Sequence, residues 1–186
     1  MAEISDPLQD LELPQTDGAW IGCSLGVTAD KFEVDARDEL RMISQHMAAQ
    51  AKLSLHIVTR NLDAELYDNA AFAETLSSLA RRSKYSFIYL LVMDSDSAVK
   101  NGHRLIYLHQ KLDSYIKIRK LNEQYKDYIS AFMLADERGV IFRQSGDGYA
   151  AEVNYNDPQL AGNLVKFFNE AWEVSGPDPQ LRRLHI

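Results

Sequence analysis

The chain has 186 residues, of which 46% are hydrophobic and 25% are charged, a composition that fits one ordinary globular domain. Its formal net charge of −7 argues against general nucleic-acid binding, because that binding depends on a basic surface. No apolar run reaches the ~20 residues of a membrane-spanning helix, the acidic start does not fit a signal peptide, and the single Cys23 cannot form an internal disulfide. We therefore expect a cytoplasmic protein that does not contact a membrane.

The composition divides the chain into two unequal parts. Residues 1–18 are acidic, contain Pro7 and Pro14, and show no periodicity, so we expect a flexible leader. No linker rich in Pro, Gly or Ser interrupts the remainder. Residues 19–186 are therefore predicted to form a single domain.

Helical and extended patterns alternate along the first part of this domain. Asp35 is expected to cap a helix that runs to Gln50, with Leu40, Ile43 and Met47 on its apolar face. The elements that follow are a strand at 53–59, a polar loop at 61–69, a helix through Phe72 and Leu79 that ends at Arg82, an apolar strand at 86–93, a loop at 94–102, a helix at 103–112 and a strand at 115–120.

The pattern then changes to a hairpin and a final helix. Short strands at 129–135 and 140–143 flank a turn, and a further strand is expected at 150–155. Asp157 followed by Pro158 predicts the start of a helix. The chain after Ser175 is expected to have no regular secondary structure. The predicted fold is therefore α/β: a mixed, mostly parallel sheet of βαβαβ, then a hairpin, a strand and a helix, with helices on both faces.

This order and two of its strings resemble one half of the phospholipase D superfamily. The hairpin SAFMLADERGVIF resembles the family's catalytic hairpin, and NYNDPQLAGNLVKFFNEAW resembles the family's C-terminal strand and helix. The resemblance covers residues 36–175. It implies a phospholipase D-like half domain, and by analogy with single-half members that pair, a homodimer.

The family's active site uses the motif HxKxxxxD, in which the His is the nucleophile and the Lys binds phosphate oxygens. With Asp136 as the motif's Asp, the His and Lys positions hold Ile129 and Ala131. The neighbouring register offers only Ser130 and Phe132. Because these side chains supply neither a nucleophile nor a cation, we expect a catalytically inactive module that binds a partner protein or a small anionic ligand.

Two other functions remain open from the sequence. The first is an enzyme with a replaced active site, in which Asp63, His103 and Arg104 surround a phosphate-containing substrate. The second is a regulatory companion of an acetyltransferase, since the chain also resembles an uncharacterised bacterial domain of this kind that is sometimes linked to acetyltransferases of the GNAT type.

Charged and polar residues near the expected strand ends form the candidate ligand-binding set, since ligands of such sheets bind beyond the carboxyl ends of the parallel strands. They are Arg60, Asn61, Asp63, His103, Arg104, Arg119 and Arg143. Several of them have a plainer interpretation. Arg60 and Asp63 pair to order a loop, His103 is an exposed residue near a helix cap, and Arg119 with Lys117 protects an edge strand.

Other motifs are weaker. Asp94 and Asp96 after an apolar strand resemble the start of the haloacid dehalogenase phosphatases, with Asp147 as a later metal ligand, but Ala98 departs from that pattern. A polar loop is the favoured interpretation. His109 and Lys111 form an HxK string that falls on a helix face. The five histidines show no zinc spacing, so neither a metal nor a cofactor is predicted.

Overall fold

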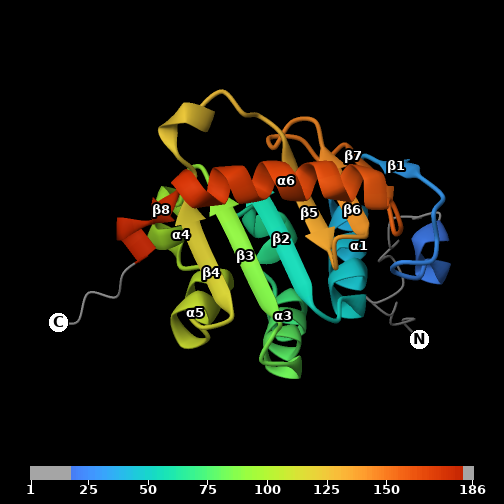
Figure 1. The fold of residues 1–186 in the computed structure, drawn as a ribbon, viewed down its shortest axis with the longest axis horizontal. Helices are drawn as coiled ribbons and strands as arrows, with labels where there is room; N and C mark the ends of the chain where they lie inside the picture. The colour runs from blue at the N-terminus through green and yellow to red at the C-terminus, as the bar shows by residue number, and fades with distance from the viewer. Residues whose placement is uncertain (1–17, 182–186) are drawn as a thin grey trace, which may run out of the picture.

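The computed structural model describes residues 18–181, which form one eight-stranded mixed sheet in the order β1-β7-β6-β5-β2-β3-β4-β8 (Figure 1). The strands are β1 (Phe32–Val34), β2 (Ser54–Thr59), β3 (Phe87–Val92), β4 (Ile116–Lys120), β5 (Ala131–Ala135), β6 (Gly139–Arg143), β7 (Ala151–Asn154) and β8 (Gly176–Pro177). β2, β3 and β4 are parallel, and every other pairing is antiparallel. The α/β prediction is confirmed, while the leader expected at 1–18 lies, apart from Gly18, outside the described residues.

The helices divide between the two faces of the sheet. Those described are α1 (Arg37–Gln50), α2 (Ala64–Tyr67), α3 (Ala70–Arg82), α4 (Asp96–Asn101), α5 (Arg104–Lys111) and α6 (Pro158–Val174), with 3-10 turns at Ala19–Gly22, Glu123–Tyr125 and Pro179–Leu181. In Figure 1, α6 crosses in front of the strands, while α1, α3 and α5 lie behind or below them. In the described part of the chain, no helix is long and apolar enough to cross a membrane.

Several local predictions were wrong. The loops expected at 61–69 and 94–102 contain the short helices α2 and α4, which have too few turns to show a period. Asp35 does not cap α1; the N-cap residue is Ala36, and no side chain caps that end. Strand β1 was not predicted, and the segment after Ser175 adds strand β8 to the sheet.

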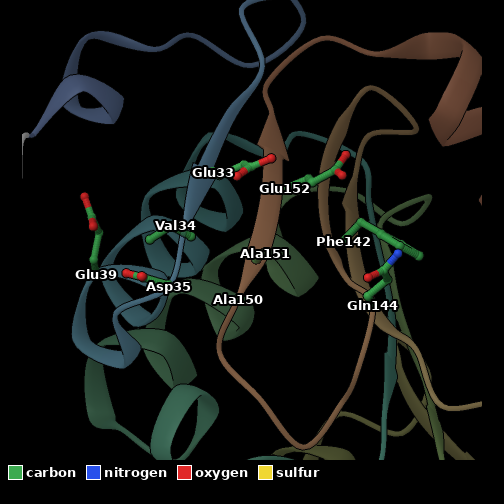
Figure 2. Close-up of a pocket in the computed structure, with 9 residues that line it drawn as sticks. All are labelled: Glu33, Val34, Asp35, Glu39, Phe142, Gln144, Ala150, Ala151 and Glu152. Carbon is green, nitrogen blue, oxygen red and sulfur yellow. The ribbon is translucent and has the colours of Figure 1, made fainter.

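Strands β7 and β1 extend the sheet beyond the hairpin, and β1 forms its edge. Phe32, Glu33 and Val34 pair with Val153, Glu152 and Ala151. Glu33 and Glu152 therefore lie directly opposite each other, and both side chains lie near the outer end of the sheet (Figure 2).

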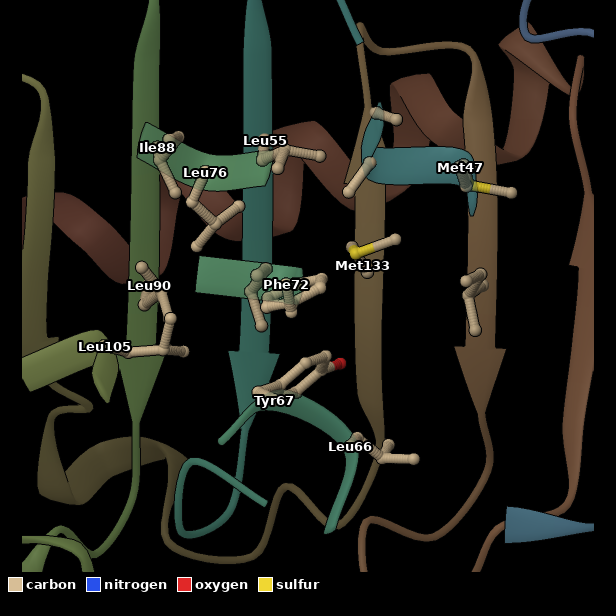
Figure 3. Close-up of a cluster of buried hydrophobic side chains, with 14 of the residues drawn as sticks. Met47, Leu55, Leu66, Tyr67, Phe72, Leu76, Ile88, Leu90, Leu105 and Met133 are labelled. Carbon is tan, nitrogen blue, oxygen red and sulfur yellow. The ribbon is translucent and has the colours of Figure 1, made fainter. Parts of the chain in front are cut away.

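The main core lies between the sheet and the helices α1, α3 and α5. Figure 3 shows Phe72 and Leu76 of α3 packing against Leu55 of β2 and Ile88 of β3, all fully buried. Tyr67 of α2 lies at one end of this cluster, near the carboxyl ends of the strands. At ~1.5–3 kcal/mol for each large apolar side chain removed from water, this cluster is the main stabilising contribution to the fold.

A second cluster lies on the opposite face, beneath α6. Phe168 and Trp172 of α6 pack over Val58, Leu91 and Phe132 of the central strands. These strand residues face α6 because alternate residues of a strand point to opposite faces of the sheet. The predicted Asp157 cap is confirmed, since its side chain accepts a hydrogen bond from the Leu160 amide, with Pro158 in the first turn.

Asp136 connects the hairpin turn to the start of β2. Its carboxylate accepts hydrogen bonds from the amides of Lys52, Leu53 and Ser54 at 2.8, 2.8 and 2.9 Å, and its own amide donates to the Ser54 carbonyl. Its φ of 52° lies in the left-handed region, which Asp tolerates better than most residues. The single carboxylate thus fixes how the hairpin meets β2.

Candidate functional site

The carboxyl ends of β2, β3 and β4 meet the beginning of β5 at one edge of the sheet. This follows from the pairing, in which Val58 of β2 lies opposite Phe132 of β5 in antiparallel register. A groove of about 270 Å³ lies at this edge. It is lined by Arg60, Met93, Asp94, Leu121, Asn122, Glu123, Tyr125, Lys126, Tyr128 and Ile129, and we call it the strand-end groove.

Of the two positions that the resemblance assigns to the catalytic His and Lys, Ile129 lines this groove. Ile129 is 65% exposed, whereas Ala131 is only 3% exposed. The loop of residues 144–150 lies against them, since the Gly146 amide donates to the Ile129 carbonyl at 2.7 Å. A Cβ atom at Gly146 would lie 3.5 Å from the Cβ of Ala131 and 3.6 Å from that of Arg60. The loop therefore covers the place where the resemblance puts the lysine.

Arg143 holds this loop in place. Its guanidinium is buried and donates to the Asp63 carboxylate at 2.7 Å, to the Gly146 carbonyl at 2.8 Å and to the Gly148 carbonyl from Nε at 2.8 Å. Its Cζ also lies 5.5 Å from the ring centroid of Tyr149. Arg143 and Asp63, two members of the candidate set, thus form an ion pair with each other, and Arg143 also binds the loop backbone.

The turn that carries Asp63 is unusual. Leu62 and Asp63 both have positive φ values, 66° and 33°, a conformation that costs free energy in residues other than Gly. Asn61 shapes the turn by accepting a hydrogen bond from the Asp63 amide at 3.1 Å. Burial beside this pair raises the pKa of the Tyr67 hydroxyl, with the nearby Arg143 charge acting in the opposite direction.

Arg60 pairs with a residue other than the one the sequence suggested. Its guanidinium donates to the Asp147 carboxylate at 2.6 Å, and Asp63 pairs with Arg143 instead. Both Arg60 and Asp147 are more than half exposed, so water screens the interaction and a competing anion can reach Arg60. Arg60 is the member of the candidate set that lines the strand-end groove.

His103 and Arg104 lie at the start of α5 and serve its N-terminus. His103 is buried, not exposed as its plainer interpretation held, and its Nδ1 accepts a hydrogen bond from the Leu105 amide at 3.1 Å. Burial lowers the pKa of its imidazole, an effect that the nearby Asp68 charge opposes. Arg104 is paired with Asp68 at 3.0 Å. Neither side chain lines the strand-end groove.

Arg119 lies apart from the other candidates, at the C-terminal end of α6. Its guanidinium lies 4.2 Å from the ring centroid of Trp172 and donates to the carbonyls of Trp172 at 2.7 Å and Ser175 at 3.3 Å. A cation here stabilises the negative end of the helix. Strand β4, which carries Arg119, is not the free edge strand of the plainer interpretation, because Arg119 pairs with Pro177 of β8.

The acidic residues that resemble a phosphatase site form contacts with other groups of the chain. Asp94 accepts a hydrogen bond from the Asp96 amide at 2.9 Å, which is the turn-forming role of its plainer interpretation. Asp147 is paired with Arg60. Within residues 18–181, no three His, Cys, Asp or Glu side chains gather in a way that could hold a metal ion.

Sequence reasoning missed the segment that forms one wall of the strand-end groove. Tyr125 and Tyr128 both pack against Phe167 of α6, and the Tyr128 ring stacks on it with a centroid distance of 4.4 Å. Burial raises the pKa of the Tyr128 hydroxyl to about 12. The available signal was the density of aromatic residues between the last parallel strand and the hairpin.

Similar folds occur in solved structures. TrmBL2, an archaeal chromatin protein whose structure shows a novel mode of DNA binding, matches with a TM-score of 0.61 and 13% identity over 85% of this chain and 57% of that protein. Nuc from Salmonella typhimurium, a phospholipase D family member, matches with a TM-score of 0.55 and 12% identity over 79% of this chain and 97% of that one. NucT from Helicobacter pylori matches with a TM-score of 0.57 and 11% identity over 80% and 99% of the two chains.

The fold is thus phospholipase D-like, as the resemblance predicted. The chain belongs to a family described as a domain of unknown function (DUF7931), whose model matches residues 36–184. A comparison with curated protein sequences found no match.

Proposed function

We propose that this chain is a non-catalytic phospholipase D-like module that binds a partner protein or a small anionic ligand. The observation that supports this most directly is the hairpin, in which Ile129 and Ala131 stand at the nucleophile and cation positions while the 144–150 loop covers Ala131. A phosphoryl-transfer reaction needs a nucleophile and a positive charge at the reacting phosphate, and neither side chain supplies one.

The strand-end groove is the proposed binding site. It combines two cations, Arg60 and Lys126, and two carboxylates, Asp94 and Glu123, with the side chains of Tyr125 and Tyr128 and the exposed apolar side chain of Ile129. Arg60 would exchange its exposed pairing with Asp147 for a phosphate or carboxylate of the ligand. The mixed lining also fits a peptide that places an acidic side chain beside an apolar one.

A thermal-shift screen tests this proposal. Pure protein is heated with nucleotides, phospholipid head groups, acetyl-CoA and short oligonucleotides, the last because a fold neighbour binds DNA. A ligand at one hundred times its Kd adds about 2.7 kcal/mol to the free energy of unfolding. We expect the double variant Arg60→Gln/Lys126→Gln to abolish any shift, and Lys111→Gln/Lys117→Gln, with the same change of charge, to retain it.

A second assay can overturn the non-catalytic part of the proposal. The pure protein is incubated with bis(4-nitrophenyl) phosphate and with phosphatidylcholine in the presence of ethanol. We expect release of nitrophenol and formation of phosphatidylethanol at the rate of buffer alone. Turnover that copurifies with the protein and disappears when it is denatured would contradict the proposal.

The two alternative functions have less support. An enzyme built on Asp63, His103 and Arg104 would have to free Asp63 from Arg143 and Arg104 from Asp68, because these pairs already engage their charges. For the acetyltransferase companion, we expect co-purification of an acetyltransferase with the tagged chain from its native host. A pull-down that recovers none would remove that alternative.

We also propose a cytoplasmic homodimer in which residues 19–186 act as one folded unit. The support is the likeness to single-half phospholipase D proteins, since in that family a complete site needs two copies. Light scattering of the pure protein should give a mass near twice 21.1 kDa. A monomeric mass across the micromolar range would refute the pairing.

A further inference from the structure

A row of paired side chains runs across the sheet on the face that α6 covers. Helix α6 does not cover the end of this row on β1 and β7. The pairings place Glu33, Glu152, Phe142 and Phe132 side by side on β1, β7, β6 and β5. Phe132 is buried in the cluster beneath α6, and Phe142 packs against the same cluster while half-buried. Helix α6 begins at Pro158 and does not cover the two glutamates that follow Phe142 in the row. Glu152 is partly exposed, and Glu33 is exposed.

A groove of about 460 Å³ lies at this open end. It is lined by Glu33, Val34, Asp35, Glu39, Phe142, Gln144, Ala150, Ala151 and Glu152, and we call it the acidic groove (Figure 2). The large apolar side chain that the groove offers on this face is Phe142, whereas Val34 and Ala151 are almost fully buried and belong to the main core on the other face. It is therefore an uncovered part of the sheet face, formed by three strands and the start of α1.

The charges around the acidic groove are unbalanced. Four carboxylates line it, and the cation paired with one of them is Lys31, whose Nζ lies 2.9 Å from Glu152. Glu33 lies directly opposite Glu152 in the antiparallel pair, an arrangement of like charges that destabilises a sheet. A bound cation would relieve this repulsion.

We propose that the acidic groove binds a basic, extended segment of a partner protein, with Lys or Arg side chains toward Glu33 and Glu39 and an apolar side chain against Phe142. Charge complementarity and the apolar lining favour such a segment over other occupants. A nucleic acid would be repelled by the carboxylates, and no three of them gather closely enough to hold a metal ion in the described part of the chain. This surface is separate from the strand-end groove, so the two proposals stand or fall independently.

The test is an NMR titration of the full-length, ¹⁵N-labelled protein with an eight-residue peptide of alternating Lys and Leu. Amide signals of Val34, Ala151 and Glu152 should shift, and a peptide with Glu in place of Lys should leave them unchanged. The double variant Glu33→Gln/Glu39→Gln should weaken binding about two- to thirtyfold, the range expected for losing two exposed ion pairs. The matched variant Glu74→Gln/Glu170→Gln, with the same change of net charge elsewhere, should stay within about twofold of the original.

The result that overturns the proposal is equal weakening by both variants, which would mean that the peptide responds only to net charge. Shifts confined to the strand-end groove, or no shift at millimolar peptide, would overturn it as well. A misfolded variant cannot imitate the expected result, because Glu33→Gln removes a repulsion and should leave the melting temperature unchanged or higher. Arg60→Gln should leave peptide binding at the acidic groove intact, which separates this outcome from failure of the strand-end proposal.

Discussion

At the scale of single residues, the three positions that the resemblance assigns to the HxKxxxxD pattern have different environments. In that assignment Ile129 and Ala131 stand at the His and Lys positions, and Asp136 stands at the Asp position. The Asp136 carboxylate accepts three backbone amides at the start of β2. It therefore has a structural role that requires no reaction, and the part-buried Ser54 amide would cost about 1–3 kcal/mol if it were left unpaired.

The two replaced positions should tolerate restoration unequally. Ala131→Lys puts an ammonium at a position that is 3% exposed and covered by the 144–150 loop, so we expect a loss of about 2–4 kcal/mol in the free energy of unfolding. Ile129→His at a position that is 65% exposed should change it by less than about 0.5 kcal/mol. Urea unfolding measures both. Equal losses would show that the loop does not close over Ala131.

The pair of Arg143 and Asp63 should be the most sensitive polar contact near the groove. Arg143→Met leaves the Asp63 carboxylate and two loop carbonyls without their donor, so we expect a loss of about 3–5 kcal/mol. Arg60→Met removes the exposed pair with Asp147 and should cost less than about 1 kcal/mol. Denaturant midpoints of the two variants provide the comparison, and similar values would contradict the assigned role of Arg143.

At the scale of elements, α6 covers the face of the sheet opposite to the one on which α1, α3 and α5 pack. Its burial depends on Phe168, Ala171 and Trp172, and its ends are each fixed by a polar contact, Asp157 at the start and Arg119 at the end. The helix therefore has a defined start and a defined stop over the row of side chains beneath it.

Removing the cap should loosen the start of this helix. Asp157→Ala deletes the hydrogen bond to the Leu160 amide and a favourable charge near the helix N-terminus, which we expect to cost about 1 kcal/mol. Gln159→Ala, two residues further on an exposed position, should be nearly neutral and serves as the control. Hydrogen exchange of the first-turn amides should rise in the first variant alone.

Long elements were predictable because their apolar period repeats several times. Strand β3 was predicted from its continuous apolar run, the hairpin from the turn between its strands, and α6 from the Asp-Pro start and its apolar stripe. Short elements were not predictable: α2 and β1 are too brief to show a period, and β1 exists because β7 pairs with it. The candidate residues were placed near strand ends, but their partners, such as Asp147 for Arg60 and Gly148 for Arg143, come from the 144–150 loop, whose course no local pattern specifies.

At the scale of the whole molecule, buried histidines make stability depend on pH. Burial lowers the pKa of His56 to about 4 from an ordinary value of 6.5, and it also lowers the pKa values of His46 and His103. The unfolded chain therefore binds more protons between these values, and stability falls as the pH drops from about 6.5 toward 4. We expect His56 alone to account for a loss of about 2 kcal/mol between pH 7 and pH 5.

The contribution of His56 can be isolated by comparing two variants in the same aromatic cluster, where its ring contacts Phe87 and Phe168. His56→Leu should flatten the dependence of unfolding free energy on pH, because it removes the titrating group. Phe87→Leu should lower stability equally at pH 7 and pH 5. If His56→Leu leaves the slope unchanged, the imidazole is not responsible for the acid sensitivity.

The sheet order also determines when the molecule can be completed during synthesis. β2 lies near the centre, and its parallel neighbour β3 and the next parallel strand β4 follow it in the chain, so this half can assemble while the chain is still emerging. The other edge of β2 stays unpaired until β5 is made, and β1 pairs only with β7, which lies far along the chain. Long-range pairing of this kind is slow to form, so the N-terminal strand should be among the last parts to acquire its native partner. A nascent chain that stalls before residue 151 lacks β7, so the edge of β6 and the whole of β1 would have no partner strand. Exposed strand edges promote aggregation, and we therefore expect stalled chains to aggregate more readily than complete ones.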